Sequence, residues 1–256
     1  MEAPSKGTLY LVATPIGNPD DITLRALKVL KEVDIILCEE LKEGKRILSN
    51  YQIEPKELDT LNEHNENSKI EKIISDLNSG KNIALISDAG TPVFSDPGSL
   101  LVKRAIKEGI KIVPIPGASA LLLALIVSGF NIEKFVYYGW LSQKRAKRRE
   151  ELRRLRGEQR TVVIFETPYR VIPVLEDIGM VLGVDRKICV AYNLTMPDEE
   201  IIRGNVIEVI NYLSENKKKG ECVIVILFLI NERFYMFYCF INLLICEDIA
   251  KGRHCS

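Results

Sequence analysis

The sequence lacks the short motifs that mark the commonest nucleotide and hydrolase sites. No G-x-G-x-x-G follows its first strand-like run, and no G-x-x-x-x-G-K-[S/T] occurs anywhere. A dinucleotide site of the Rossmann type and a P-loop are therefore not predicted. The nucleophile elbow G-x-S-x-G is also missing, which removes the usual signal of a serine hydrolase of the α/β class.

Metal-binding residues are scarce as well. The two histidines are His64 and His254, and no two cysteines stand in a C-x-x-C pair. We therefore predict no metal site. The six cysteines are Cys38, Cys189, Cys222, Cys239, Cys246 and Cys255. The first residues, Met1–Gly7, are polar, and the first apolar run is only Leu9–Ala13, so no signal peptide is expected. Together these features favour a reducing, cytoplasmic setting.

The chain has no excess of charge. It contains 35 Lys and Arg against 35 Asp and Glu, so a uniformly basic nucleic-acid binder is excluded and any RNA site must be a local patch. The 256 residues are 46% apolar and 27% charged, which is typical of one large or two small globular domains. A chain of this length buries roughly three quarters of its unfolded surface and needs no disulfide bonds.

A long uninterrupted apolar run is absent too. The richest stretch is Leu227–Cys246, and Asn231, Glu232 and Arg233 divide it. Neither piece reaches the roughly 20 residues that a membrane-spanning helix needs, so no membrane association is predicted. The stretch is interpreted either as an extra packed helix or as a non-native extension.

Strand-like apolar runs and amphipathic helices alternate in the first half of the chain. Expected strands are Thr8–Ala13, Asp34–Cys38, Asn82–Ser87 and Ile110–Ile115, and expected helices are Thr23–Val33, Ser68–Ser79, Ser99–Glu108 and Ala118–Val127. This rhythm predicts an α/β fold whose mostly parallel sheet has helices on both faces.

The second half shows a less regular pattern. Expected strands are Thr161–Phe165, Lys187–Ala191, Ile201–Val206 (with a turn signal at Gly204-Asn205) and Glu221–Ile226, around a helix near Pro168–Leu182. A mixed α/β sheet is predicted there. We place an N-terminal domain at 1–117, a C-terminal domain at 118–226 and an atypical aromatic-rich tail at 227–256.

Loops rich in Gly and Pro follow three strands of the first domain. They are Thr14–Asp21, Ser87–Gly98 and Pro116–Ala120. In a parallel sheet the carboxyl ends of the strands form one edge, where ligands bind. Gly allows close backbone approach to a ligand and Pro fixes loop shape. Ordinary tight turns would explain one such loop, whereas three at one edge favour a ligand cleft.

These loops carry a family resemblance. The segments ATPIGNPDDITLRAL, LISDAGTPVFSDPG and PIPGASA, followed by LNEHNENSK, FVYYGWLSQKRAKRREELRRL, RTVVIFETPYR, LEDIGMVLG and KKKGECVIVI, resemble the ribosomal RNA small subunit methyltransferase I group of the tetrapyrrole methylase superfamily. The resemblance extends from about Gly7 to Ile226, with its motifs in the family's order.

The resemblance implies a fold, a reaction and a set of ligand residues. It implies two α/β domains with S-adenosylmethionine in the cleft between them, and a homodimer that methylates a cytidine ribose 2′-hydroxyl in small-subunit (16S) ribosomal RNA, free or within the 30S particle. The implied cofactor residues are Pro15, Asp88, Ala89, Gly90, Thr91, Phe94, Ser119 and Ala120, with Phe165 closing the site from the second domain.

A ribose hydroxyl is a weak nucleophile, so a general base or an orienting hydrogen bond would assist the reaction. Glu39, His64 and Glu166 are the candidates for catalysis, and Glu40 and Asp88 are further carboxylates at the same sheet edge. Two of these positions have a plain alternative. Glu39-Glu40 suits a solvated helix start, and His64 suits a solvated loop.

The segment 143–160 contains nine cations and three acids, and aromatic residues precede it. Cations beside aromatic residues favour phosphate contact with base stacking, although a solvated helix with internal ion pairs such as Glu150–Arg154 would also produce this pattern. The candidate RNA-binding residues are Lys144, Arg145, Lys147, Arg148, Arg149, Arg153, Arg154 and Arg170.

The chain departs from the family's usual residues at three motifs. It has Glu39-Glu40-Leu41-Lys42 for Glu-Asp-Thr-Arg, Thr167-Pro168-Tyr169-Arg170 for Ser-Pro-His-Arg, and Tyr192-Asn193-Leu194-Thr195-Met196 for Arg-Glu-Leu-Thr-Lys. Two alternatives to an active ribosomal RNA methyltransferase therefore stay open. One is a methylase of a small tetrapyrrole, and the other is a non-catalytic RNA-binding relative.

Overall fold

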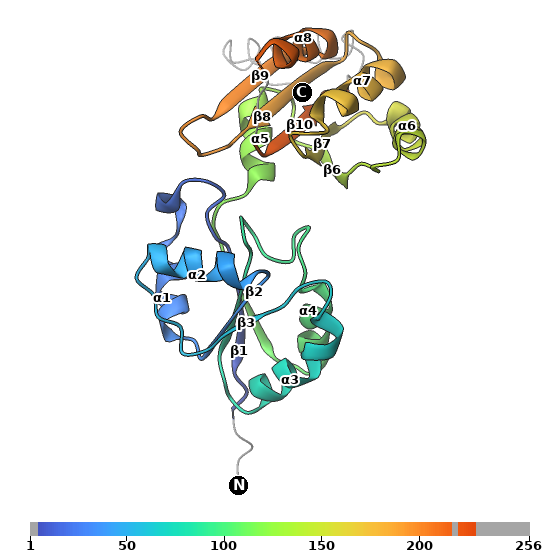
Figure 1. The fold of residues 1–256 in the computed structure, drawn as a ribbon. Helices are drawn as coiled ribbons and strands as arrows, with labels where there is room; N and C mark the ends of the chain where they lie inside the picture. Colours follow the sequence, from blue (N-terminus) through green and yellow to red (C-terminus); the bar gives the residue numbers. More distant parts are fainter. Residues whose placement is uncertain (1–4, 217–219, 229–256) are drawn as a thin grey trace, which may run out of the picture. The chain divides into compact units, whose positions relative to one another are not determined.

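The computed structural model describes residues 5–216 and 220–228 and divides into two compact units (Figure 1). The first unit is Met1–Leu123 with Asn193–Glu199, and the second is Ala124–Tyr192 with Glu200–Ser256. The division falls inside helix α5 (Ala120–Ser128), whereas the sequence-based boundary stood at 117/118. The expected tail at 227–256 lies outside the described residues except for Leu227 and Phe228.

The sheet of the first unit is wholly parallel, as predicted. Its strand order is β3-β2-β4-β1-β5. The strands are β1 (Thr8–Val12), β2 (Ile35–Cys38), β3 (Leu58–Thr60), β4 (Ile83–Ile86) and β5 (Lys111–Ile115). All residues of β2 and β4 are buried, which is expected of strands covered on both faces.

Helices cover both faces of this sheet. They are α1 (Leu24–Glu32), α2 (Leu41–Asn50), α3 (Glu66–Asn78) and α4 (Ser99–Lys107), with a 3-10 turn, η1 (Pro19–Asp21). One core layer joins the sheet to α3 and α4, and the other joins it to α1 and α2. Thr23 begins α1 because its hydroxyl accepts a hydrogen bond from the Ala26 amide, an N-cap contact.

The second unit contains a mixed sheet, which confirms that expectation. Its order is β6-β7-β10-β8-β9, with β6 and β7 parallel and the other pairs antiparallel. The strands are β6 (Phe135–Trp140), β7 (Thr161–Glu166), β8 (Lys187–Tyr192), β9 (Glu200–Asn205) and β10 (Cys222–Ile226). Gly204 and Asn205 are the last residues of β9 and precede a helix directly.

Helices α6, α7 and α8 pack on one face of this second sheet. Their bounds are α6 (Arg145–Arg154), α7 (Val171–Leu182) and α8 (Val206–Asn216), and a 3-10 turn, η2 (Leu155–Gly157), ends α6. Their apolar side chains form one core with alternate residues of the strands, including Val162, Ile164 and Ile224. Phe228 belongs to the same core.

The link between β8 and β9 belongs to the first unit. Within this link, the Thr195 hydroxyl accepts a hydrogen bond from the Asn18 amide at 3.0 Å. Gly17 fits tightly against the same link, since a Cβ there would lie 2.6 Å from Met196 Cγ and 2.9 Å from the Leu194 carbonyl oxygen. Any larger residue at position 17 would therefore force the link to move.

Candidate functional site

Three loops of the first unit are joined at the carboxyl ends of β1, β4 and β5. The Thr14 amide donates a hydrogen bond to the Gly90 carbonyl at 2.8 Å. In return, the Gly90 amide donates to the Thr14 carbonyl at 3.2 Å. The Thr14 hydroxyl donates to the Ser87 carbonyl at 3.0 Å, and the Thr91 hydroxyl donates to the Ala118 carbonyl at 3.5 Å.

This edge therefore brings together most of the candidate cofactor residues of the first unit. Pro15 follows Thr14, and Asp88, Ala89, Gly90 and Thr91 form one loop, whose continuation carries Phe94. Ser119 and Ala120 lead into α5, and the Ser119 carbonyl accepts a hydrogen bond from the Leu123 amide. Phe165, the remaining candidate, lies on β7 in the second unit.

Carboxylates gather at the same edge. Burial raises the pKa of Glu39, and the negative charges of Asp88 and Asp96 raise it further. Burial is also the main cause that raises the pKa values of Asp88 and Asp96. Asp96 accepts a hydrogen bond from the Ser87 hydroxyl. Burial and mutual repulsion thus disfavour the ionised form of these carboxyl groups. A cationic ligand at this edge would stabilise the ionised form.

Asp88 has unused hydrogen-bonding capacity. Its side chain accepts a hydrogen bond from the Glu40 backbone, yet its Oδ1 atom is buried and has no hydrogen-bond partner among the described residues. A buried acceptor without a donor is unfavourable by itself. This atom is therefore a candidate acceptor for a polar group of a ligand.

His64 lies on an exposed loop near this edge. Its side chain is 86% exposed and lies 3.7 Å from the Glu63 carboxylate. Two residues before His64, the side-chain amide of Asn62 donates a hydrogen bond to the Glu39 carbonyl at 3.4 Å. The structure thus brings the loops of His64 and Glu39 together, while leaving the imidazole in solvent.

The acidic segment around His64 also has a structural role that sequence reasoning missed. Glu66 is buried, and its Oε1 accepts the amides of Leu100 and Leu101 at 3.0 and 3.1 Å. These amides belong to the second and third residues of α4, in the first turn where backbone amides lack partners within the helix, so Glu66 caps that helix from a distance. Part of the segment LNEHNENSK is therefore explained by folding.

Glu166 is placed differently from a general base. It ends β7 and its side chain is 0% exposed, with one oxygen 3.1 Å from the Arg170 guanidinium and the other accepting the Thr167 amide at 2.8 Å. A base must reach the proton that it removes. Within the second unit, Glu166 instead holds Arg170, which donates to the Leu141 carbonyl at 2.9 Å.

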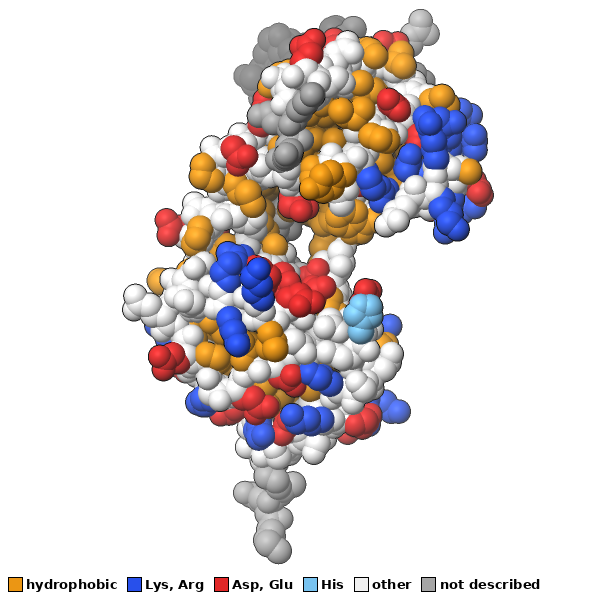
Figure 2. Space-filling model, in the orientation of Figure 1, with side chains coloured by type: hydrophobic (Ala, Val, Ile, Leu, Met, Phe, Trp, Pro, Cys, Tyr) orange, Lys and Arg blue, Asp and Glu red, His pale blue; other side chains and the backbone are white. Residues whose placement is uncertain are grey.

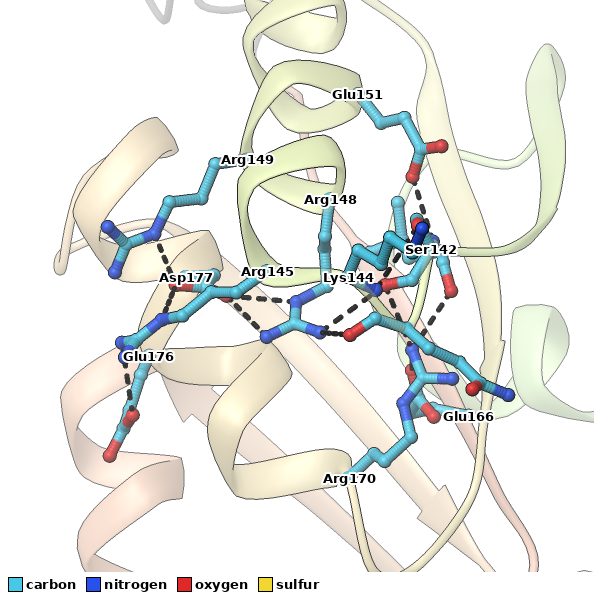
Figure 3. Close-up of polar contacts among 12 residues, drawn as sticks. Ser142, Lys144, Arg145, Arg148, Arg149, Glu151, Glu166, Arg170, Glu176 and Asp177 are labelled. Carbon is cyan, nitrogen blue, oxygen red and sulfur yellow. Dashed lines mark hydrogen bonds and ion pairs between the residues drawn. The ribbon is translucent and has the colours of Figure 1, made fainter.

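The basic helix α6 is anchored through one buried carboxylate on α7 (Figure 3). The side chain of Asp177 is 0% exposed. Its carboxylate oxygens lie 2.6 Å from a guanidinium nitrogen of Arg148, 2.6 Å from one of Arg149 and 3.1 Å from one of Arg145. Burial raises the pKa of Asp177, but the hydrogen bonds from Arg149, Arg148 and Arg145 outweigh burial and the net pKa is lowered. Asp177 therefore stays ionised at neutral pH.

Arg148 corrects the list of RNA-binding candidates. It is 5% exposed, and besides Asp177 it contacts the carbonyls of Ser142 and Gln143, each at 3.3 Å. A buried guanidinium satisfied on all sides cannot reach an RNA phosphate, so its role is to fix α6. Sequence reasoning missed Asp177, although a charged residue on the otherwise apolar face of Val171–Leu182 is a signal of a buried ion pair.

Other cations of α6, together with Lys144 at its N-cap, remain at the surface. Lys144, Lys147 and Arg153 are exposed, and none of them makes an ion pair among the described residues. Arg154 is exposed but pairs with Glu150. Figure 2 shows Lys and Arg side chains gathered over α6. This helix thus presents a local basic surface on a chain without net charge.

The family departures lie in varied surroundings. Lys42 is exposed on α2, and Tyr169 is 87% exposed. Asn193 is buried with a φ of 44°, and its amide group donates to Asp198. Met196 follows in the same link and its amide donates to the Asn193 carbonyl at 2.8 Å. Asn193, the buried residue among these departures, is therefore hydrogen-bonded within the folded link and is not exposed to a ligand.

The described residues contain neither a metal-binding cluster nor a membrane-spanning helix. No group of His, Cys, Asp and Glu side chains there has the arrangement of a metal site. Among the same residues, no helix has both the length and the apolar character needed to cross a membrane.

Comparison with known proteins shows consistent similarity. The family profile described as Tetrapyrrole (Corrin/Porphyrin) Methylases matches residues 8–210. The Ribosomal RNA small subunit methyltransferase I of Halalkalibacterium halodurans is 43% identical over 221 residues, which are 86% of this chain and 76% of that protein. The protein of the same name from Thermotoga maritima is 43% identical over 220 residues, which are 86% of this chain and 98% of that protein.

A solved structure supports the fold. The cobalamin biosynthetic enzyme cobalt precorrin-4 methyltransferase, CbiF, superposes with a TM-score of 0.63 at 19% identity, covering 86% of this chain and 94% of that one. At this identity the similarity concerns the fold alone.

Proposed function

The chain belongs to the tetrapyrrole methylase family and, within it, to the ribosomal RNA small subunit methyltransferase I group, and from this premise we propose that it transfers a methyl group from S-adenosylmethionine to a cytidine ribose 2′-hydroxyl in small-subunit ribosomal RNA. The observation that carries the proposal is the combination, in one chain, of the acidic loop edge in the first unit and the exposed basic helix α6 in the second.

The loop edge of the first unit fits S-adenosylmethionine. The buried Oδ1 of Asp88, which has no hydrogen-bond partner among the residues that the structure describes, would accept a hydrogen bond from a polar group of the cofactor. Backbone groups of the joined loops at Pro15, Gly90 and Ser119 would serve its amino-acid end. Bound there, S-adenosylmethionine would supply a methyl carbon on a positively charged sulfonium, and the raised pKa values of Glu39, Asp88 and Asp96 support the binding of a cation at this edge.

Glu39 is the best placed of the three candidate bases. Glu166 is buried against Arg170, and His64 is in solvent. Glu39 lies partly buried at the loop edge with a raised pKa, which makes its carboxylate a stronger proton acceptor. We assign it the role of accepting the proton of the ribose hydroxyl. The bond from that oxygen to the methyl carbon would form as the sulfur–methyl bond breaks, and the electron pair of the broken bond would stay on sulfur in the departing neutral thioether.

The RNA partner is a ribosomal RNA strand, free or in the 30S particle. The exposed cations of α6, together with Arg145, Arg149 and Arg154, would contact its phosphates and set the position of the target nucleotide. Arg170 would contribute by holding the segment that precedes this helix, at Leu141 and Ser142, rather than by binding phosphate. The family resemblance supports a homodimer, and a substrate made in the cytoplasm supports action there.

The test is transfer of radiolabelled methyl from S-adenosylmethionine to small ribosomal subunits that lack this modification. We expect label in RNA, mapped to a 2′-O-methylcytidine. Glu39→Gln should lower the rate of transfer by about 10²-fold or more, the usual contribution of a general base, with cofactor binding retained. Glu32→Gln, an exposed acid at the far end of α1, is the matched control and should leave the rate unchanged.

The alternatives predict different results. Label in a small tetrapyrrole but not in RNA would identify a corrin or porphyrin methylase. RNA binding without any transfer would identify a non-catalytic relative. Full activity in Glu39→Gln with loss in His64→Gln would move the role of base to His64.

A further inference from the structure

Three aromatic side chains of the second unit form one cluster. The Phe165 ring centroid lies 5.1 Å from that of Tyr137 and 5.9 Å from that of Trp140, with the ring planes at 70° and 79°. These edge-to-face contacts support both outer rings against Phe165. Trp140 nevertheless remains 47% exposed, an unusual exposure for the largest aromatic side chain in a well-packed unit.

A β-bulge produces this cluster. In β6, Tyr137 pairs with Val163 and Trp140 pairs with Phe165, but Gly139 already pairs with Ile164, so the register shifts by one residue. Residues three apart in a regular strand would point to opposite faces. The extra residue brings Tyr137 and Trp140 to the face that carries Phe165, and the φ of +84° at Gly139 is the conformation that glycine permits at such a bulge.

The segment that follows Trp140 is held firmly from three directions (Figure 3). Arg170 donates to the Leu141 carbonyl, Arg148 donates to the Ser142 carbonyl, and the Ser142 amide donates to Glu151 at 2.8 Å. Arg170 and Arg148 are themselves fixed by the buried carboxylates of Glu166 and Asp177. The exposed indole is therefore presented on a rigid base, which lowers the entropic cost of stacking on it.

The basic surface of α6 begins only a few residues later. Lys144 and Lys147, both exposed, stand four and seven positions after Trp140 in the sequence. A rigid aromatic face followed directly by exposed cations is the combination that binds single-stranded nucleic acid, with bases on the ring and phosphates on the cations.

We propose that Trp140, supported by Phe165 and Tyr137, is a stacking platform for an unpaired nucleobase of the RNA substrate. This inference rests on the proposed function, since it assigns a base-contacting element to the same RNA partner. The platform contacts the base face, so it contributes affinity and positioning without reading base identity.

Trp140 is the single tryptophan of the chain, so intrinsic fluorescence reports on this position directly. The probe is a short oligocytidylate, and the reference is an abasic ribose-phosphate oligomer of equal length, which offers the same phosphates without bases. We expect saturable quenching of Trp140 by the oligocytidylate and none by the abasic oligomer at concentrations where both are bound.

Variants separate stacking from charge. Trp140→Leu should weaken oligocytidylate binding by about tenfold, in the range measured for one stacked base, and should raise KM for methyl transfer more than it lowers kcat. Trp140→Phe keeps an aromatic face and should restore most of the affinity. Tyr137→Leu should reduce the quenching amplitude in the otherwise native chain by loosening the indole.

Several outcomes would overturn the platform. One is binding of oligocytidylate without quenching, and another is equal affinity and KM in Trp140→Leu and the native chain. Quenching by S-adenosylmethionine alone, with none added by RNA, would assign the ring to the cofactor's adenine instead. Methyl transfer to RNA without quenching would reject the platform and keep the proposed function, whereas quenching by RNA without transfer would support the platform and reject the activity.

Discussion

At the scale of single residues, Asp177 determines how much charge α6 retains at its surface. Its buried carboxylate binds three guanidinium groups, of which only Arg148 is fully buried. Removing one partner of a buried ion pair leaves an uncompensated charge, and the usual cost is about 3 to 5 kcal/mol. Asp177 is thus the residue of this cluster whose loss matters most for folding.

We predict that Asp177→Asn lowers the free energy of unfolding by about 3 kcal/mol at pH 7, measured by urea denaturation. The effect depends on pH because the pKa of Asp177 is lowered in the folded state. Its contribution is complete above the unfolded value of about 3.9 and is lost as the pH falls through the lowered folded pKa. The difference in the free energy of unfolding between the native chain and the variant should therefore be constant near neutral pH and should become smaller in strong acid.

Glu176→Gln is the matched control for this prediction. Glu176 is the neighbouring acid, is half exposed, and lies 3.8 Å from Arg145. Exposed pairs contribute about 1 kcal/mol or less, so this variant should unfold close to the native chain. Equal stability of Asp177→Asn and Glu176→Gln would contradict the anchoring role.

Residue identity alone could not separate Arg148 from its neighbours. The excess of cations in 143–160 is visible in the sequence, but which of them is buried depends on an acid on α7, in a distant part of the chain. The same limit applies to Glu166. A glutamate at a strand end suits a base, and only the position of Arg170, four residues later at the start of α7, shows that Glu166 is buried in an ion pair.

At the scale of elements, α6 has two faces with different tasks. Leu152 and Arg148 face the interior, while Lys144, Lys147 and Arg153 face solvent. Charge reversal of the three solvent-facing residues to Glu should weaken RNA binding without unfolding the unit. Because each phosphate contact to a single strand contributes about 0.7 to the slope of log affinity against log salt, the slope should become shallower by up to about 2.

The matched control reverses three exposed lysines of the first unit. Lys28, Lys103 and Lys107 change the net charge by the same amount but lie on α1 and α4. If both triple variants lost RNA affinity equally, net charge rather than α6 would explain binding. Measurement of binding to the same RNA over a range of salt concentrations separates the two results.

Elements with strong periodicity were predicted well, and those governed by tertiary contacts were not. The strands around Ile35–Cys38 and Ile83–Ile86 follow from continuous apolar runs. β6 was missed because its bulge breaks the alternation at Tyr138-Gly139. β3 was missed because it has only three residues, and α2 because it begins without a side-chain cap. α8 was missed because it follows β9 directly, without a turn that would mark its start.

At the scale of the whole molecule, the class of both sheets followed from the sequence, but the division of the chain did not. Sequence reasoning assigns one continuous segment to each domain. The chain instead returns to the first unit at Asn193–Glu199, through contacts of Gly17 and Asn18 with the link. Because those contacts use a backbone amide and the absence of a side chain, they leave no periodic signal.

The last described residues of the second unit, Leu227 and Phe228, contact other parts of that unit. The Leu227 amide donates to the Lys187 carbonyl at 3.0 Å, and the Phe228 ring lies 4.9 Å from the Arg186 guanidinium and is buried in the core. The match to the Thermotoga maritima relative already covers 98% of that protein with 220 residues of this chain. We therefore predict that a chain ending after Phe228 retains both its unfolding midpoint and its rate of methyl transfer.

A chain ending after Ile226 is the matched comparison. It loses a buried aromatic side chain, whose transfer from water contributes about 2 to 3 kcal/mol, and it loses the cation–π contact with Arg186. Its midpoint in urea should fall clearly below that of the chain ending after Phe228. If the two truncated chains unfolded alike, Phe228 would not be part of the stabilising core. If both lost methyl transfer while remaining folded, residues beyond Phe228 would be required for the reaction, because stability alone would no longer explain the loss.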